Sequence, residues 1–304
     1  IESVSILLRT TVAANKLSCK VKAKAKGTAK ITCTVKRKKK TYKLTCKVKV
    51  KAKKTVVASS LKDTYAKIVP YMGTCLNYGS ASNPRELQNA STMKFVKKQY
   101  NSFTLENEMK PDAILGSSAK LISVADAKKK GYYIPAGYTE STVPELAFTT
   151  VDKSLEAAKN NGLKMRAHTL VWHSQTPSWF FTKNYDGSKV VTPAVMDARL
   201  DFYIHNVMGH VMDKEKALTG SAGSIVYAWD VVNEYLHRPS FAFFKTWTSV
   251  YGDMGNSPSY VKKAFEIAYD MLKSYQATDK VTLFYNDYNT YFGVKDTLNL
   301  VEFI

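Results

Sequence analysis

Residues 225–234 constrain the fold most, because they have the composition of a strand that is buried on both faces. Seven of the ten are apolar or aromatic and four are β-branched, which is typical of a central strand in a parallel sheet. The run closes on Asn233-Glu234, so a carboxylic acid lies where such a strand opens into its loop, the edge at which α/β barrels collect catalytic groups. An isolated Asn-Glu pair is more often a salt-bridged or capping glutamate, and the rest of the chain must decide.

Strand and helix signals alternate from residue 62 onward. The strand-like runs are 71–78, 101–107, 163–172, 225–234 and 281–286, and helix signals cover 84–100, 118–130 and 150–161 and begin again at 192, 257 and 296. This alternation predicts a parallel sheet or a (β/α)₈ TIM barrel, of which about five β/α units are present. The segment between residues 116 and 149 is longer than a barrel connection needs, and we expect it to lie over the carboxyl ends of the strands and shape a cleft.

Positive charge is concentrated at the amino-terminal end. The net charge is +20, yet residues 1–60 hold 18 Lys and Arg against one acid, whereas the other 244 residues hold 27 against 24. Apolar residues alternate with lysines or other polar residues along 17–24, 31–35 and 42–50, which predicts antiparallel strands with one buried face and turns at Gly27 and residues 37–40. We therefore expect a partial all-β, Ig-like module at 1–55, a linker at 56–61 and the barrel at 62–304.

The lysine-covered face of this module has three possible roles. Solvation and protection against edge pairing is the commonest, and attachment to an anionic cell wall or polysaccharide is the alternative. Nucleic-acid binding is disfavoured, because Tyr42 is the only aromatic residue available for stacking. Cys19, Cys33 and Cys46 share the alternation of their apolar neighbours and are expected to be buried thiols, although a disulfide among them stays open. Neither a Cys-x-x-Cys pair nor a membrane-length apolar run occurs.

Clustered polar residues follow several of the predicted strands. The segments are Glu106-Asn107-Glu108-Met109-Lys110, His168-Thr169-Leu170-Val171-Trp172-His173-Ser174-Gln175, Trp229-Asp230-Val231-Val232-Asn233-Glu234 and Asn286-Asp287-Tyr288-Asn289. In this order and spacing they resemble glycoside hydrolase family ten, the endo-β-1,4-xylanases, over residues 70–304. The Asn-Glu pair alone recurs in many sugar hydrolases, whereas the combination of segments is specific to this family.

The resemblance implies retaining cleavage of xylan or xylo-oligosaccharides without a cofactor. Glu234 would be the general acid/base, paired with a nucleophilic carboxylate about 5–5.5 Å away. The implied sugar contacts are Asn233 to the 2-hydroxyl, Glu106, Asn107, Lys110, His168 and Gln175 on the non-reducing side, Trp172 at the floor and Tyr288 beyond the cut. Trp179 is expected to pack. His168 and His173 differ in strand parity, so they predict no metal site.

The sequence departs from the family pattern in one respect. Five strands are found where the family barrel has eight, and the sixth-, seventh- and eighth-strand motifs, including the nucleophilic glutamate, have no counterpart. We expect these residues alone to be inactive and poorly soluble, since the first and fifth strands are left unpaired. The simplest account is part of a secreted or cell-surface bacterial xylanase. The alternatives are a non-catalytic xylan-binding surface protein and a nucleic-acid-binding protein that relies on residues 1–60.

Overall fold

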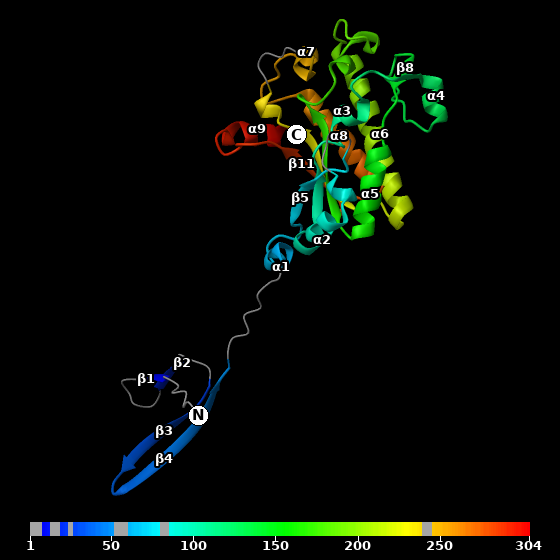
Figure 1. Ribbon diagram of the computed structural model, residues 1–304. Helices are drawn as coiled ribbons and strands as arrows, with labels where there is room; N and C mark the ends of the chain where they lie inside the picture. Colours follow the sequence, from blue (N-terminus) through cyan, green and yellow to red (C-terminus); the bar gives the residue numbers. More distant parts are fainter. Residues whose placement is uncertain (1–7, 13–18, 24–26, 52–59, 80–84, 239–244) are drawn as a thin grey trace. The chain divides into compact units, whose positions relative to one another are not determined.

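The computed structural model describes residues 8–12, 19–23, 27–51, 60–79, 85–238 and 245–304. The chain divides into two compact units, residues 1–58 and 59–304 (Figure 1). Most of the predicted linker, residues 56–59, lies outside the described residues. Ser60 and Leu61 do not continue a linker, because Ser60 caps helix α1 (Leu61–Tyr65) and its Oγ accepts a hydrogen bond from the Asp63 amide at 3.2 Å.

The described strands of the first unit form two antiparallel pairs. Strand β1 (Leu8–Val12) pairs with β2 (Cys19–Ala23), and β3 (Gly27–Arg37) pairs with β4 (Lys40–Val50). The predicted turn at residues 37–40 is confirmed, with Lys38 at a φ of 52°. Gly27 instead opens β3 rather than forming a turn. Each described strand pairs with only one other described strand, so these strands form ribbons and not the sandwich that an Ig-like module requires.

The cysteine prediction is wrong for Cys46, whose free thiol is exposed. The apolar face of β4 is open as well, since Leu44 is 69% exposed. The physical reason is that a two-stranded ribbon has no second layer to cover either face. The side chains of Cys19 and Cys33 lie outside the described part of the structure.

The second unit is built on a parallel five-stranded sheet, as predicted. Its strands are β5 (Gly73–Leu76), β6 (Ser102–Leu105), β9 (Lys164–Trp172), β10 (Val226–Asn233) and β11 (Thr282–Asn286). The spatial order β11-β10-β9-β6-β5 follows the chain order, which is how consecutive strands of a (β/α)₈ barrel are arranged. The main connecting helices are α2 (Ala90–Gln99), α5 (Thr149–Asn161), α6 (Pro193–Thr219), α8 (Ser259–Ser274) and α9 (Val294–Phe303). The site residues therefore belong to neighbouring strands.

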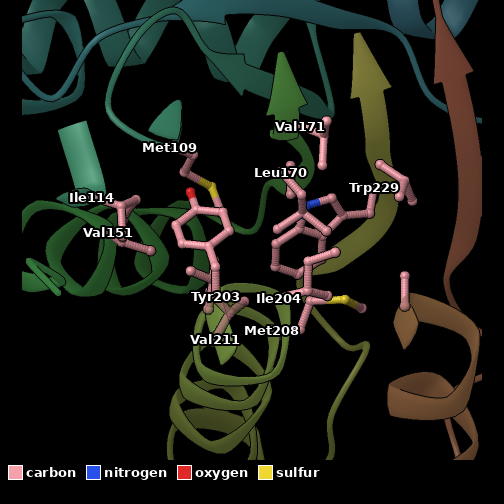
Figure 2. Close-up of a cluster of buried hydrophobic side chains, with 14 of the residues drawn as sticks. Met109, Ile114, Val151, Leu170, Val171, Tyr203, Ile204, Met208, Val211 and Trp229 are labelled. Carbon is pink, nitrogen blue, oxygen red and sulfur yellow. The ribbon is translucent and has the colours of Figure 1, made fainter. Parts of the chain in front are cut away.

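Strand β10 is buried on both faces, as its composition predicts. Ala228, Trp229, Val231 and Val232 are each at most 1% exposed. Figure 2 shows the Trp229 ring beside Leu170 of β9 and close to side chains of α6. The register shifts between Asp230 and Val232 against both neighbouring strands, which marks an irregularity just before the polar end of the strand.

A buried carboxylate holds the start of β10. Glu215, near the end of α6, is fully buried. It accepts hydrogen bonds from the backbone amides of Gly223, Ile225 and Val226 at 2.8, 2.7 and 2.5 Å. The carboxylate thus pairs three backbone amides at the start of β10 that would otherwise be buried without an acceptor. The Glu215 side chain therefore fixes the position of the loop that leads into the strand.

The long insertion differs from its prediction. The expected helix at 118–130 is a short strand, β7 (Leu121–Ser123), followed by α4 (Val124–Lys129), and β7 pairs with β8 (Thr142–Pro144). The insertion is fastened to α6: the Tyr133 amide donates to Asn206 Oδ1 at 2.9 Å, and Arg199 Nε donates to Glu140 at 2.7 Å. Its position over a cleft stays a prediction, because these contacts join it to a helix and not to sugar-binding side chains.

Shorter helical pieces complete the second unit. They are α3 (Pro111–Leu115), α7 (Trp247–Tyr251) and the 3-10 turns at Glu86–Gln88, Ser178–Phe181, Lys183–Tyr185 and Tyr235–His237. Exposed apolar side chains gather around α9, where Phe292 is 78% and Val301 55% exposed. Exposed apolar side chains of this kind favour association between molecules, and poor solubility stays a prediction. Within the described ranges, no helix is both long enough and apolar enough to cross a membrane.

Candidate active site

Glu234 lies directly after β10 and is held by both neighbouring strands. Its backbone is left-handed, with φ 56° and ψ 36°, and its amide donates to the Asn286 carbonyl of β11 at 2.8 Å. On the other side, Trp172 Nε1 at the end of β9 donates to Glu234 Oε2 at 2.9 Å. The half-buried carboxyl therefore has a fixed position with one oxygen engaged by the indole.

A buried ion-pair network lies earlier on the same strands, between β10 and β9. Asp230 is 2% exposed, and its carboxylate accepts from Arg166 Nε at 2.9 Å and lies 2.9 Å from His168 Nδ1. Since Asp230 takes Nδ1 of His168, Nε2 is the ring nitrogen that can make a further hydrogen bond. Asn286 links the network to the acid: its side chain lies 3.3 Å from Arg166 and 2.8 Å from Asn233. The sequence analysis did not predict that Arg166 and Asp230 hold the site residues in place. Charged residues inside buried strands are almost always paired, which is a signal that could have identified them.

The loops after β6 and β9 meet through polar side chains. Lys110 Nζ donates to Asn107 Oδ1 at 3.1 Å and to Gln175 Oε1 at 2.7 Å. The same ammonium lies 4.9 Å from the centroid of the Trp172 ring, and burial lowers the pKa of Lys110. Glu106, in the same loop, accepts from Asn77 Nδ2 at 2.7 Å. The structure thus brings together Asn107, Lys110, Trp172 and Gln175, and their contacts to a sugar stay a prediction.

Tyr288 lies on the other side of Glu234 and is part of a fixed assembly. Its ring is 49% exposed and stacks on His237 with centroids 3.8 Å apart. Asp287 binds both residues, since its carboxylate lies 2.6 Å from His237 Nδ1 and accepts from the Tyr288 amide at 2.8 Å, and the Tyr285 hydroxyl donates to it as well. A cavity of about 440 Å³ adjoins this assembly and is lined by His237, Asp287 and Asn289 among others. His237 was not predicted, and Asp287 was named only as part of the segment 286–289, because their contact joins distant parts of the chain.

Other predicted roles can be compared with the structure. Trp179 is 9% exposed and its Nε1 donates to the Gly116 carbonyl at 3.1 Å, so the packing role is confirmed. Within the residues that the structure covers, no three His, Cys, Asp or Glu side chains gather as a metal site requires.

His173 gives a pH-dependent prediction. Its Nδ1 is buried without a hydrogen-bond partner, and burial lowers the pKa of the ring despite the opposing charges of Glu234 and Asp287. A histidine whose folded pKa is depressed takes up its proton later than it does in the unfolded chain, so stability falls as the pH drops below the unfolded value of about 6.5.

We therefore expect the unfolding midpoint in urea to decrease between about pH 6.5 and pH 5, and to decrease less in His173→Gln. The four tryptophans all lie in the second unit, so their fluorescence follows that unit alone. Equal slopes for the two proteins would show that His173 does not carry this dependence.

The geometry defines a class of protein. A carboxyl at the end of a barrel-type strand, engaged by an indole and flanked by amide, lysine and histidine side chains, provides an acid beside a surface for binding hydroxyl groups. Glycoside hydrolases with a (β/α)₈ fold carry their acid at such a strand end. The sequence model of glycosyl hydrolase family 10 matches residues 60–304, and the chain belongs to this family.

Curated relatives of the chain are endo-1,4-beta-xylanases. Endo-1,4-beta-xylanase A of Butyrivibrio fibrisolvens is 47% identical over 247 residues, which are 81% of this chain and 56% of the relative. Endo-1,4-beta-xylanase B of the same organism is 38% identical over 70% of this chain and 29% of its own length. The chain thus spans little more than half of the first relative and less of the second.

Solved structures agree in fold. The endo-1,4-beta-xylanase of Caldicellulosiruptor owensensis has a TM-score of 0.52 at 29% identity, covering 80% of this chain and 58% of the other. The N-terminal modules of xylanase 10B from Clostridium thermocellum, complexed with xylohexaose, have a TM-score of 0.58 at 23% identity, covering 97% of this chain and 56% of the other. The five-stranded sheet is therefore part of the family's barrel.

Proposed function

We propose that this chain provides the acid/base side of the active site of a retaining endo-1,4-β-xylanase. The observation that carries the proposal is the placement of Glu234 between Trp172 and Asn286, directly after Asn233. In this position a protonated Glu234 donates to the glycosidic oxygen as the bond from that oxygen to the anomeric carbon breaks. A nucleophilic carboxylate forms the new bond to the anomeric carbon, and Glu234 then takes a proton from the water that releases the sugar.

Substrate contacts follow from the two groups of side chains beside Glu234. Asn107, Lys110 and Gln175 form one hydrogen-bonded set, and we assign it, with Glu106 and His168, to sugar hydroxyls on the non-reducing side. Trp172 forms the floor and Asn233 meets the 2-hydroxyl. The exposed ring of Tyr288, backed by His237, is the stacking face for the sugar on the leaving-group side.

The nucleophile is proposed to come from a strand beyond the five of the described sheet. The partner carboxylate of a retaining enzyme lies about 5–5.5 Å from the acid, and the strands that would complete the barrel between β11 and β5 are the ones that face Glu234 across it. The first unit is proposed to be an accessory module, and secretion remains the proposed location because an insoluble polymer must be met outside the cell.

The test is an assay of reducing ends released from xylan by two polypeptides. We expect the 304 residues alone to release none, and a polypeptide that continues them through the rest of the barrel to be active, because only the second contains both carboxyls. An extended polypeptide that binds xylan without cutting it would replace this proposal with the non-catalytic binding function.

A further inference from the structure

A second cavity lies between the insertion and the outer side of α6 and α8. Its volume is about 410 Å³, within the range of small-ligand sites. Its walls come from residues 130–133 of the insertion, Phe148, the middle of α6 and the end of α8. None of these residues belongs to the candidate active site, so the cavity needs an explanation of its own.

Two aromatic rings in the wall are held by stacked histidines. Tyr133, 44% exposed, lies on His205 with centroids 4.1 Å apart, and Phe148 lies on His210 at 3.8 Å with an interplanar angle of 8°. Asn206 fixes the backbone of Tyr133 from both sides, accepting from its amide and donating to its carbonyl, each at 2.9 Å. The aromatic surfaces are therefore positioned in advance of any ligand, which reduces the entropy lost on binding.

Three carboxylates lie in or beside the cavity wall: Asp213 accepts from the Tyr275 hydroxyl at 2.9 Å, and Asp201 and Asp152 lie next to the two histidines. His205 is paired with Asp201 at 2.6 Å and His210 with Asp152 at 2.7 Å, and Lys130 is paired with Glu145. Such a lining offers aromatic rings and carboxylate acceptors, and its one lysine, Lys130, is already paired with Glu145, so it disfavours an anionic ligand. It therefore suits a neutral ligand that has both an apolar face and hydroxyl groups, which describes a sugar ring.

Gly209 forms part of the cavity wall in the middle of α6. Glycine is unfavourable inside a helix, and packing does not require it here: an added Cβ would meet Met271 Cε at 3.5 Å and Tyr275 Oη at 3.7 Å, which are ordinary contacts. Alanine would fit and would favour the helix. The glycine thus keeps space open in a place where neither backbone conformation nor close packing demands it.

We propose that this cavity is a second carbohydrate-binding site, which takes a neutral xylose-type oligosaccharide on the outer side of α6. The identity of the sugar rests on the proposed function, whereas the site itself rests on the stacked rings, the carboxylate acceptors and Gly209. The insertion then has a role that the active site does not use: with α6 and α8 it holds a polysaccharide chain away from the catalytic carboxyl.

The five histidines of the chain allow one titration to test both sites. His168, His173 and His237 lie beside Glu234 or its neighbours, and His205 and His210 line the second cavity. We expect xylohexaose, added to the whole chain, to move the ring-proton NMR signals of both sets with separate affinities. The signals are assigned with single His→Gln variants. In Trp172→Ala the response of the first set is expected to weaken while that of His205 and His210 persists.

The matched variants are at Tyr133. Tyr133→Ala is expected to lower the affinity for xylohexaose, as measured from the His210 signal, by about tenfold, because it removes one stacking face. Tyr133→Phe keeps the ring and should keep the affinity. Gly209→Leu fills the cavity and should abolish the response at both His205 and His210. Signals of His205 and His210 that stay still while the first set moves would overturn this inference and leave the proposed function intact. Movement of His205 and His210 alone would support this site and would mean that sugar binding beside Glu234 needs the strands beyond β11.

Discussion

Glu234→Gln is expected to lower the rate of xylan hydrolysis by about 10³-fold or more, in a polypeptide that continues this chain through the rest of the barrel. Glutamine has the size of glutamate, and its amide oxygen can still accept from Trp172 Nε1, so the fold and the position of the side chain are kept. What is lost is the proton for the leaving oxygen and the base for the attacking water. Release of reducing ends at saturating xylan measures the change.

Two controls make this result specific. Glu266, exposed on α8, gives the matched variant Glu266→Gln, which should retain full activity. An aryl xylobioside whose phenol leaves without protonation should lose far less in its first step than xylan does, because that step no longer needs an acid. An equal loss with both substrates would mean that Glu234 acts in binding or folding and not as the acid.

Glu215→Ala is expected to destabilise the second unit by about 3–5 kcal/mol. The reason is that the amides of Gly223, Ile225 and Val226 would be left buried without an acceptor, and the start of β10 would lose its anchor. Burial raises the pKa of Glu215, while the three amides act in the opposite direction. Urea unfolding followed by tryptophan fluorescence measures the change in the free energy of unfolding.

Glu215→Gln separates the effect of the hydrogen bonds that the side chain accepts from the effect of its negative charge. Glutamine keeps one oxygen, which can still accept from Ile225 and Val226, and its NH₂ group would face the Gly223 amide. We therefore expect an intermediate loss. Glu266→Ala, on an exposed helix position, should change stability by less than about 0.5 kcal/mol. If Glu215→Ala were as stable as this control, the prediction would be wrong, and water would have to replace the carboxylate as the acceptor for the three amides.

The parallel sheet could be predicted because its strands are buried apolar runs separated by helical patterns. Residues 163–172 and 225–234 show this directly, and the structure places β9 and β10 there. The roles at the strand ends depended on the resemblance to the family. Lys110 and Gln175 illustrate the limit, since each would be an ordinary surface residue if taken singly. The contacts that join them cross 65 positions of the chain.

Other features could not be read from local patterns. The strand alternation around Cys46 predicts a buried face, but only the tertiary structure shows that the described ribbon has no layer above it. The helical signal at 118–130 is confirmed only for α4 (Val124–Lys129), because residues 121–123 pair with β8 instead. Likewise, the bond of His237 to Asp287 spans 50 positions, and nothing in either residue's neighbours indicates the other.

The left-handed backbone at Glu234 has a consequence for how this protein evolves. A residue with a side chain loses about 1 kcal/mol or more in this conformation, whereas glycine loses little and asparagine less than most. Stability and catalysis therefore favour different residues at this one position. In a gene copy released from selection for sugar cleavage, drift toward Gly or Asn at position 234 would make the fold more stable. A glutamate in this conformation is what the proposed acid/base role requires, at a cost in stability.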